Sequence, residues 1–159
     1  ISAKDRPVID AALEKARVTG APAAAMQMPD GSIVLGKTSS LLGAASALLL
    51  NALKHFAGIP KEVELISPNI IEAVQHLKVD HLGNRNPRLH TDELLIALTI
   101  SAATYEPAAL AMDYLDKLEG CDAHSSVILT QVDVKTIKKL GINLTCEPCY
   151  QVKKLYHAK

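Results

Sequence analysis

One segment of the sequence matches a phosphate-binding pattern. Gly31 to Thr38 reads G-S-I-V-L-G-K-T, which fits G-x-x-x-x-G-K-[ST] letter for letter, and a helix is predicted after it. A phosphate loop needs main-chain N–H groups that turn inward around the phosphate oxygens. Ile33 to Leu35, in the middle of the segment, instead favour an extended strand. Pro29-Asp30-Gly31 is typical of a hairpin turn, so the pattern is a weak indication of a nucleotide loop.

This objection does not apply to a simpler anion site at the same place. Lys37, Thr38 and Ser39 come just before a long helix predicted from about Leu41 to Ala57. The N–H groups at a helix N-terminus attract phosphate and carboxylate groups, and lysine adds a positive charge. The alternative is that the hydroxyl groups only cap the helix.

A second candidate site is the polar segment 84–93, which lies between two apolar helices. Arginine can bind carboxylate or phosphate in a bidentate manner, and loops on a rigid scaffold often carry sites. The ligand-binding candidates here are Asn84, Arg85, Arg88 and His90. The alternative is a solvated connector with an Asn-Pro turn and a helix cap. His81 with His90 would offer two metal ligands, but nothing in the sequence fixes their geometry.

A third candidate combines cysteine and histidine. Cys121-x-x-His124 followed by Cys146-x-x-Cys149 has the number and spacing of ligands for a tetrahedral zinc site. Two alternatives stay open: the cysteines pack as small apolar residues, or His124, Ser125 and Cys146 are catalytic. No carboxylate stands at a spacing diagnostic of a Ser-His-Asp arrangement. No cofactor is assigned.

The elements that must position these residues follow from periodicity and turn signals. Helices are expected over 7–17, 41–57, 68–78, 94–103 and 107–118, with a short one from Asp133 to Gly141. Strands are expected over 23–28, 32–35, 63–66, 126–130 and 142–145. The first two strands form a hairpin and strand–helix–strand crossovers add parallel pairs, so we expect an α/β fold with one mixed sheet and buried Ala- and Leu-rich helices. Residues 1–159 are taken as one domain with a basic tail over 151–159.

Composition excludes several classes of protein. The chain has 159 residues, of which 48% are apolar and 3% aromatic, and its 17 basic and 17 acidic residues cancel. The apolar fraction is too high for a disordered chain, and a neutral chain with few rings is unlike a nucleic-acid binder. The longest apolar run, 41–52, is too short and too interrupted to span a membrane. Three cysteines and no opening signal peptide favour the cytoplasm.

Several blocks of the sequence together resemble the C-terminal region of a bacterial family of uncharacterised proteins, known as a domain of unknown function. The blocks are 20–26, 28–34, 36–54, 84–93, 124–129 and 140–148. The resemblance implies that a larger N-terminal part, with its own glycine-rich loop, belongs to the whole protein. Some relatives carry the label of ATP-dependent peptidase, and no H-E-x-x-H motif is present here. Cys146 fits the family pattern, whereas a cysteine at 149 departs from it.

Two functions remain open. The first is a catalytic or ligand-binding cytoplasmic domain that handles a phosphate- or carboxylate-bearing small molecule. Lys37, Thr38 and Ser39 would hold the anion, and Arg85, Arg88 and His90 would complete the pocket. The second is a non-catalytic domain that serves assembly, with contacts to the N-terminal region and to further copies of the chain. The first predicts that Lys37, Arg85, Arg88, His90 and His124 share one cleft, and the second predicts that they are scattered.

Overall fold

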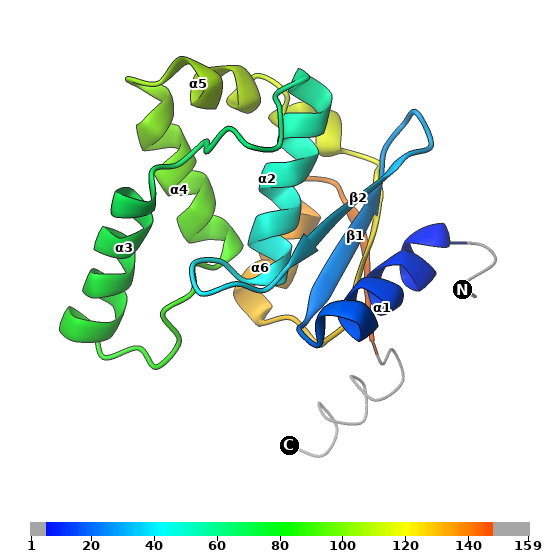
Figure 1. Cartoon of the computed structure of the whole chain (residues 1–159), viewed down its shortest axis with the longest axis horizontal. Helices are drawn as coiled ribbons and strands as arrows, with labels where there is room; N and C mark the ends of the chain where they lie inside the picture. The colour runs from blue at the N-terminus through cyan, green and yellow to red at the C-terminus, as the bar shows by residue number, and fades with distance from the viewer. Residues whose placement is uncertain (1–5, 148–159) are drawn as a thin grey trace.

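Four strands form one mixed sheet in the computed structural model, which describes residues 6–147 (Figure 1). Their order is β2-β1-β3-β4, with β1 at Ala23–Gln27, β2 at Ile33–Lys37, β3 at Asp122–Ser125 and β4 at Asn143–Cys146. β1 is antiparallel to β2 and β3, whereas β3 and β4 are parallel. The predicted α/β fold with a hairpin and parallel strands is therefore confirmed.

The β1–β2 hairpin turns where the Asp-Gly pair predicts it. The Asp30 carboxylate accepts the Ser32 N–H at 2.9 Å, and Gly31 adopts a φ of +88° that other residues rarely reach. The Met28 N–H then donates to the Ser32 carbonyl at 2.8 Å and starts the ladder. The segment that matches the phosphate-loop pattern is thus the turn and second strand of a hairpin.

Helices cover both faces of the sheet. Helix α1, Pro7–Thr19, packs Val8 and Ala12 against Ala25 on one face. Helix α2, Ala44–Ala57, lies in the main core on the other face, together with Ala24 and Met26 of β1. Strand alternation explains this division, because successive residues of β1 point to opposite faces.

The contact between α2 and β2 is unusually close. A Cβ atom added to Gly36 would lie 2.4 Å from the Leu48 nitrogen and 2.8 Å from the Ala44 carbonyl oxygen. Only a glycine allows the strand and the helix backbones to approach this far. Gly36, the second glycine of the phosphate-loop pattern, is therefore explained by packing.

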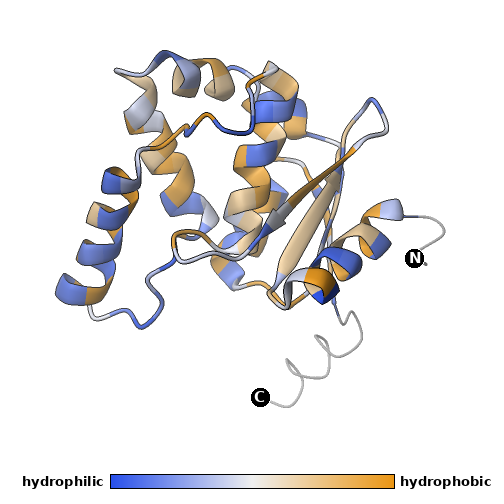
Figure 2. Cartoon of the chain, viewed as in Figure 1, coloured by the Kyte–Doolittle hydropathy of each residue, from blue (hydrophilic) through white to orange (hydrophobic). Residues whose placement is uncertain are grey.

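The remaining helices contribute residues to the same main core as α2, on that face of the sheet. They are α3 (Pro68–His76, continued by a π-helical turn, Leu77–His81), α4 (Thr91–Ala102), α5 (Glu106–Met112), a 3₁₀ turn (Leu115–Leu118) and α6 (Gln131–Lys139). Hydrophobic residues concentrate in α2, α4 and the sheet (Figure 2). No helix within residues 6–147 is long and apolar enough to cross a membrane.

Several expected boundaries are corrected by the structure. The strand expected over 63–66 is an irregular segment, and the one expected over 126–130 lies earlier, at β3. The long helix begins at Ala44, capped by Gly43, rather than at Leu41. Helix α6 begins at Gln131, after the cap Thr130, rather than at Asp133, and α4 begins at Thr91, after His90, rather than at residue 94.

Helix α4 is one of the Ala- and Leu-rich helices that are expected to be buried, and this expectation is only partly correct. Leu94, Ala97 and Leu98 lie in the core, but Ile96 and Ile100 are 61% and 63% exposed. A helix that is apolar all round therefore leaves one apolar face at the surface of this domain.

Candidate functional site

Three strands end at the same edge of the sheet, because β2, β3 and β4 run in the same direction. Just past these ends, the Thr38 N–H donates to Pro22 at 2.9 Å and the Glu147 N–H donates to Ser125 at 2.9 Å. Ligands of open α/β sheets commonly bind outside the carboxyl ends of the strands. Lys37, Thr38, Ser39, His124, Ser125 and Cys146 all lie at or near this edge.

The Ser39 hydroxyl is used within its own loop. Its oxygen accepts the N–H groups of Leu41 and Leu42, both at 3.2 Å. Because α2 starts only at Ala44, Ser39 stabilises the turn that precedes the helix. Lys37 ends β2 and is exposed, so it lies on the strand and not at the helix N-terminus where the sequence places it.

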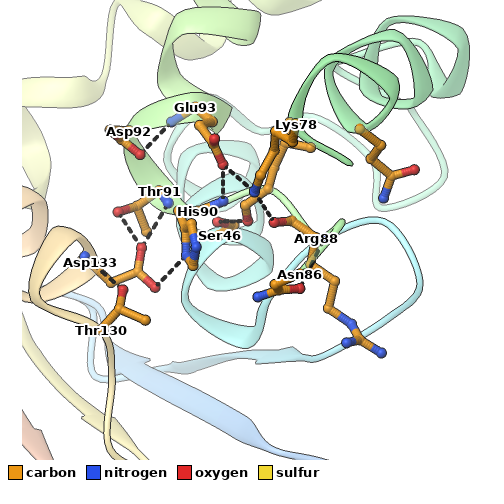
Figure 3. Close-up of polar contacts among 12 residues, drawn as sticks. Ser46, Lys78, Asn86, Arg88, His90, Thr91, Asp92, Glu93, Thr130 and Asp133 are labelled. Carbon is orange, nitrogen blue, oxygen red and sulfur yellow. Dashed lines mark hydrogen bonds and ion pairs between the residues drawn. The ribbon is translucent and has the colours of Figure 1, made fainter. Parts of the chain in front are cut away.

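The polar segment 84–93 enters a network that we call the polar junction, shown in Figure 3. Its members are Lys78, Arg88, His90, Thr91, Glu93 and Asp133. The Lys78 side chain is 3% exposed, and its ammonium group donates to Glu93 at 2.7 Å and to the Arg88 carbonyl at 2.6 Å. Glu93 also accepts the His90 N–H at 2.9 Å. The buried charge is thus neutralised and hydrogen-bonded.

Asp133 holds the other side of the polar junction. One of its carboxylate oxygens accepts both the N–H and the hydroxyl of Thr91, each at 2.8 Å. The other oxygen lies 3.6 Å from Nδ1 of His90. These contacts tie the N-terminus of α4 to α6, and a carboxylate at a helix N-terminus is favourably placed.

Arg88 and Ser39 are brought together, as the first functional hypothesis requires, but through an internal contact. The Arg88 guanidinium donates from Nε to the Ser39 carbonyl. The Asn84 N–H donates to the Lys78 carbonyl at 2.8 Å, and Arg85 is exposed on the surface. The polar junction therefore joins α4, α6, the 84–90 segment and the π-helical turn after α3 through groups that already satisfy one another.

His124 lies in a different environment from the other predicted ligands. It is completely buried, its Nδ1 shares a 2.6 Å hydrogen bond with the Thr145 hydroxyl, and its Nε2 lies 3.0 Å from Glu147 without a hydrogen bond. Burial lowers the pKa of His124, while the Glu147 carboxylate acts in the opposite direction. The sequence did not single out Thr145, the last residue of the predicted last strand, or Glu147, two positions further on.

The three candidate catalytic residues do not meet in one cluster. Ala25, which packs on α1, is paired with His124, and Ala24, on the α2 side, is paired with Ser125. Cys146 is paired with Ser125, so both face away from His124. The Ser125 hydroxyl donates to the Val127 carbonyl at 2.7 Å.

Three of the four residues of the predicted zinc set, Cys121, His124 and Cys146, lie within the described residues, and they form no ligand cluster there. Cys149 lies outside the described residues. Burial and the Asp122 charge raise the pKa of the Cys121 thiol, which disfavours the thiolate that zinc binds. Within residues 6–147, no group of three or more His, Cys, Asp or Glu side chains could hold a metal ion.

A basic cleft of about 390 Å³ runs along the outer edge of β2. We define it by its four lysines, which come from α1, from the end of β2, from α2 and from the segment after α2. They are Lys15, Lys37, Lys54 and Lys61. Ile33, Val34, Leu35 and Ile59 provide apolar lining. Of the four lysines, the sequence singled out only Lys37.

The charges of the cleft are only partly compensated within the described chain. Burial lowers the pKa of Lys54, whereas Glu64 and Glu62 act to raise it, and its ammonium group donates to the Lys61 carbonyl at 3.0 Å. His55, on the rim, lies 3.0 Å from Asp30. In residues 6–147, no carboxylate lies within ion-pair distance of the ammonium groups of Lys15, Lys37 or Lys61.

The five residues whose convergence would favour a single pocket are therefore separated, as the assembly hypothesis predicts. Lys37 lines the basic cleft, Arg88 and His90 belong to the polar junction, and His124 is buried in the sheet. The sequence pattern could not show this, since the positions depend on which face of each strand or helix is buried.

The fold and the cleft define a mixed α/β domain with a basic groove beside an edge strand. Residues 4–156 match the family described as "Domain of unknown function DUF1846, C-terminal", and the chain belongs to this family. It is 53% identical over 158 residues to "UPF0371 protein CE2832" of Corynebacterium efficiens and 52% identical over 156 residues to a "UPF0371 protein" of Streptococcus thermophilus. The chain spans 32% of the length of these curated relatives. The family resemblance seen in the sequence is confirmed.

Proposed function

We propose that this domain is a non-catalytic binding domain that holds a phosphate- or carboxylate-bearing ligand in the basic cleft. The observation that carries the proposal is the arrangement of Lys15, Lys37, Lys54 and Lys61 around one cleft with an apolar lining. Lysines brought together from separate parts of a chain repel one another, and an anion relieves that repulsion. The separation of Lys37 from Arg88, His90 and His124 removes the single pocket of the first hypothesis. The proposal therefore keeps only Lys37 of that pocket and moves the site from a helix N-terminus to the strand edge, where three further lysines join it.

The other predicted site residues are separated from one another, and this separation favours a binding role for the domain over a catalytic one. Arg88 and His90 are engaged in the polar junction, and the buried His124 has Ser125 and Cys146 on the opposite face. A catalytic role would need a nucleophile and a base within reach of one substrate position. A binding role needs only the charged, half-open cleft.

Titration calorimetry with inorganic phosphate and with citrate at low ionic strength tests this proposal. We expect saturable binding that weakens about tenfold or more in the double variant Lys37→Ala, Lys61→Ala, and that falls as salt is added. The matched control is Lys135→Ala, Lys139→Ala, which removes two exposed lysines of α6 and leaves the cleft intact. Equal affinity in the two double variants, or no binding of either anion, would contradict the proposal.

A further inference from the structure

The outer edge of β2 offers main-chain groups for pairing. The Thr38 N–H donates to Pro22 and the Met28 N–H donates to Ser32, so the even-numbered residues of this strand face β1. The N–H and C=O groups of Ile33, Leu35 and Lys37 therefore point outward along the edge of the sheet, where β2 is the terminal strand.

Only one of these outward groups has a partner in the part of the chain that the structure describes. The Asn51 side chain of α2 donates its amide to the Leu35 carbonyl at 2.8 Å. This single bond satisfies the Leu35 carbonyl in the way that one residue of a neighbouring strand would. The N–H groups of Ile33, Leu35 and Lys37 remain available, and an unpaired edge is a ready template for another strand.

The side chains beside this edge form the walls of a groove suited to an extended chain. Lys15 of α1 lies on one side of β2, and Asn51 and Lys54 of α2 lie on the other. Ile33, Val34 and Leu35 are only half-buried. An extended segment laid along β2 would cover them and would place its alternate side chains beside the lysines.

We infer that the basic cleft binds an acidic, extended polypeptide segment, which adds a strand to the sheet at β2. This inference rests on the proposed function and names the class of its anionic ligand. Main-chain hydrogen bonds to the edge would supply affinity, and Glu or Asp side chains beside the lysines would supply specificity. A free phosphate uses the lysines but none of the outward N–H groups.

Charge argues against two other occupants of the groove. A second copy of this chain, paired through its own β2, would bring its own lysine-lined cleft against this one, and like charges repel. The 151–159 segment of the sequence carries Lys153, Lys154 and Lys159 and no acidic residue. The occupant with complementary charge is an acidic segment from elsewhere.

The experiment uses an acetylated, amidated peptide of three Glu-Val repeats, which is about the length of β2. Its binding to the 159-residue chain is measured by calorimetry, beside the same peptide N-methylated at alternate residues and a Lys-Val peptide. We expect N-methylation to weaken binding about tenfold and the Lys-Val peptide not to bind. Lys37→Glu should weaken binding of the acidic peptide, and Lys135→Glu, on the exposed side of α6, should not.

Amide hydrogen exchange provides a second readout that needs no variant. On peptide binding, exchange of the Ile33, Leu35 and Lys37 N–H groups should slow, while Val34 and Gly36, already bonded to β1, should change little. Binding of phosphate without the peptide, or equal binding of the N-methylated peptide, overturns the strand inference and leaves the proposed function standing. Failure of phosphate, citrate and the acidic peptide alike overturns both.

Discussion

The ammonium group of Lys78 lies 2.7 Å from a carboxylate oxygen of Glu93, although the lysine side chain is only 3% exposed. Glu93→Gln would keep the shape of the side chain and remove the charge that neutralises the lysine. An unpaired buried charge is costly, and the remaining Arg88 carbonyl compensates only part of it. We expect a loss of about 2–3 kcal/mol in the free energy of unfolding, measured by urea denaturation.

Asp92 provides the control for this prediction. It is the neighbouring acidic residue in the first turn of α4, and it is exposed. Asp92→Asn removes the same charge near the same helix N-terminus, so it should cost only about 0.3–1 kcal/mol. If both variants lose the same small amount, the Lys78–Glu93 pair does not stabilise the polar junction.

Gly36→Ala tests the close approach of β2 and α2. The new methyl group would lie 2.4 Å from the Leu48 nitrogen, and a helix backbone cannot move as a side-chain tip can. We expect a loss of about 3 kcal/mol or more in the free energy of unfolding. Gly43→Ala is the matched control, because its nearest added contact is 4.0 Å away. It should cost about 1 kcal/mol or less, and a comparable loss in both variants would contradict the packing argument.

Gly36 also shows where sequence reasoning succeeds and where it ends. The apolar run 33–35 correctly predicted a strand, and Asp30-Gly31 correctly predicted the turn, because both signals are local. The reason for a glycine at 36 is a helix backbone twelve residues further on, which no local pattern reveals. The sequence alone was therefore enough to reject the phosphate-loop pattern, but the reason for the glycine at position 36 became clear only from the fold.

At segment 63–66, in contrast, a local sequence signal predicted the wrong structure. Its apolar residues favour a strand, yet Leu65 and Ile66 are buried in the main core without a ladder. A strand needs a neighbouring strand edge, and here Pro60 and Pro68 bracket a short connection that turns at once, with the Val63 N–H donating to the Pro60 carbonyl at 3.1 Å. Burial satisfies the apolar side chains in either conformation, so β propensity was not decisive.

The basic cleft could be predicted only in part for a related reason. Lys37 was found because a motif surrounds it, whereas Lys15, Lys54 and Lys61 are ordinary lysines along helices and a loop. Their meeting depends on α1 and α2 lying on opposite faces of the sheet beside the same edge strand. Arg88 and His90 looked more specific in the sequence and are instead engaged in holding helices together.

His124 gives a prediction on pH. Burial holds its pKa below the ordinary value of 6.5, so the unfolded chain takes up a proton more readily than the folded protein does. The stability associated with the neutral ring is therefore complete above about pH 6.5 and is lost as the pH falls. Urea denaturation between pH 7.5 and 5 should show this decrease, and it should be smaller in His124→Gln.

His81→Gln is the control for the pH series, since this side chain is exposed and removing it takes away no buried base. It should keep the decrease of the parent protein. An equal decrease in His124→Gln and in the parent would show that another group causes the loss at low pH.

Asp133 and Thr91 allow the polar junction to be tested from its other side. Thr91 is fully buried, and Asp133 accepts both its N–H and its hydroxyl. Asp133→Ala would leave two buried donors without an acceptor, at a cost of about 2–4 kcal/mol. Thr91→Val removes only the hydroxyl donor and should cost about 1–2 kcal/mol.

The double variant separates the direct contact from general damage. If the hydroxyl–carboxylate bond is the shared interaction, the two losses should not add, and the double-mutant cycle should give a coupling of about 1 kcal/mol. Asp116→Ala, at an exposed position, should change stability by no more than about 0.5 kcal/mol. Strict additivity of the Thr91 and Asp133 losses would show that the hydroxyl–carboxylate bond does not stabilise the contact between α4 and α6.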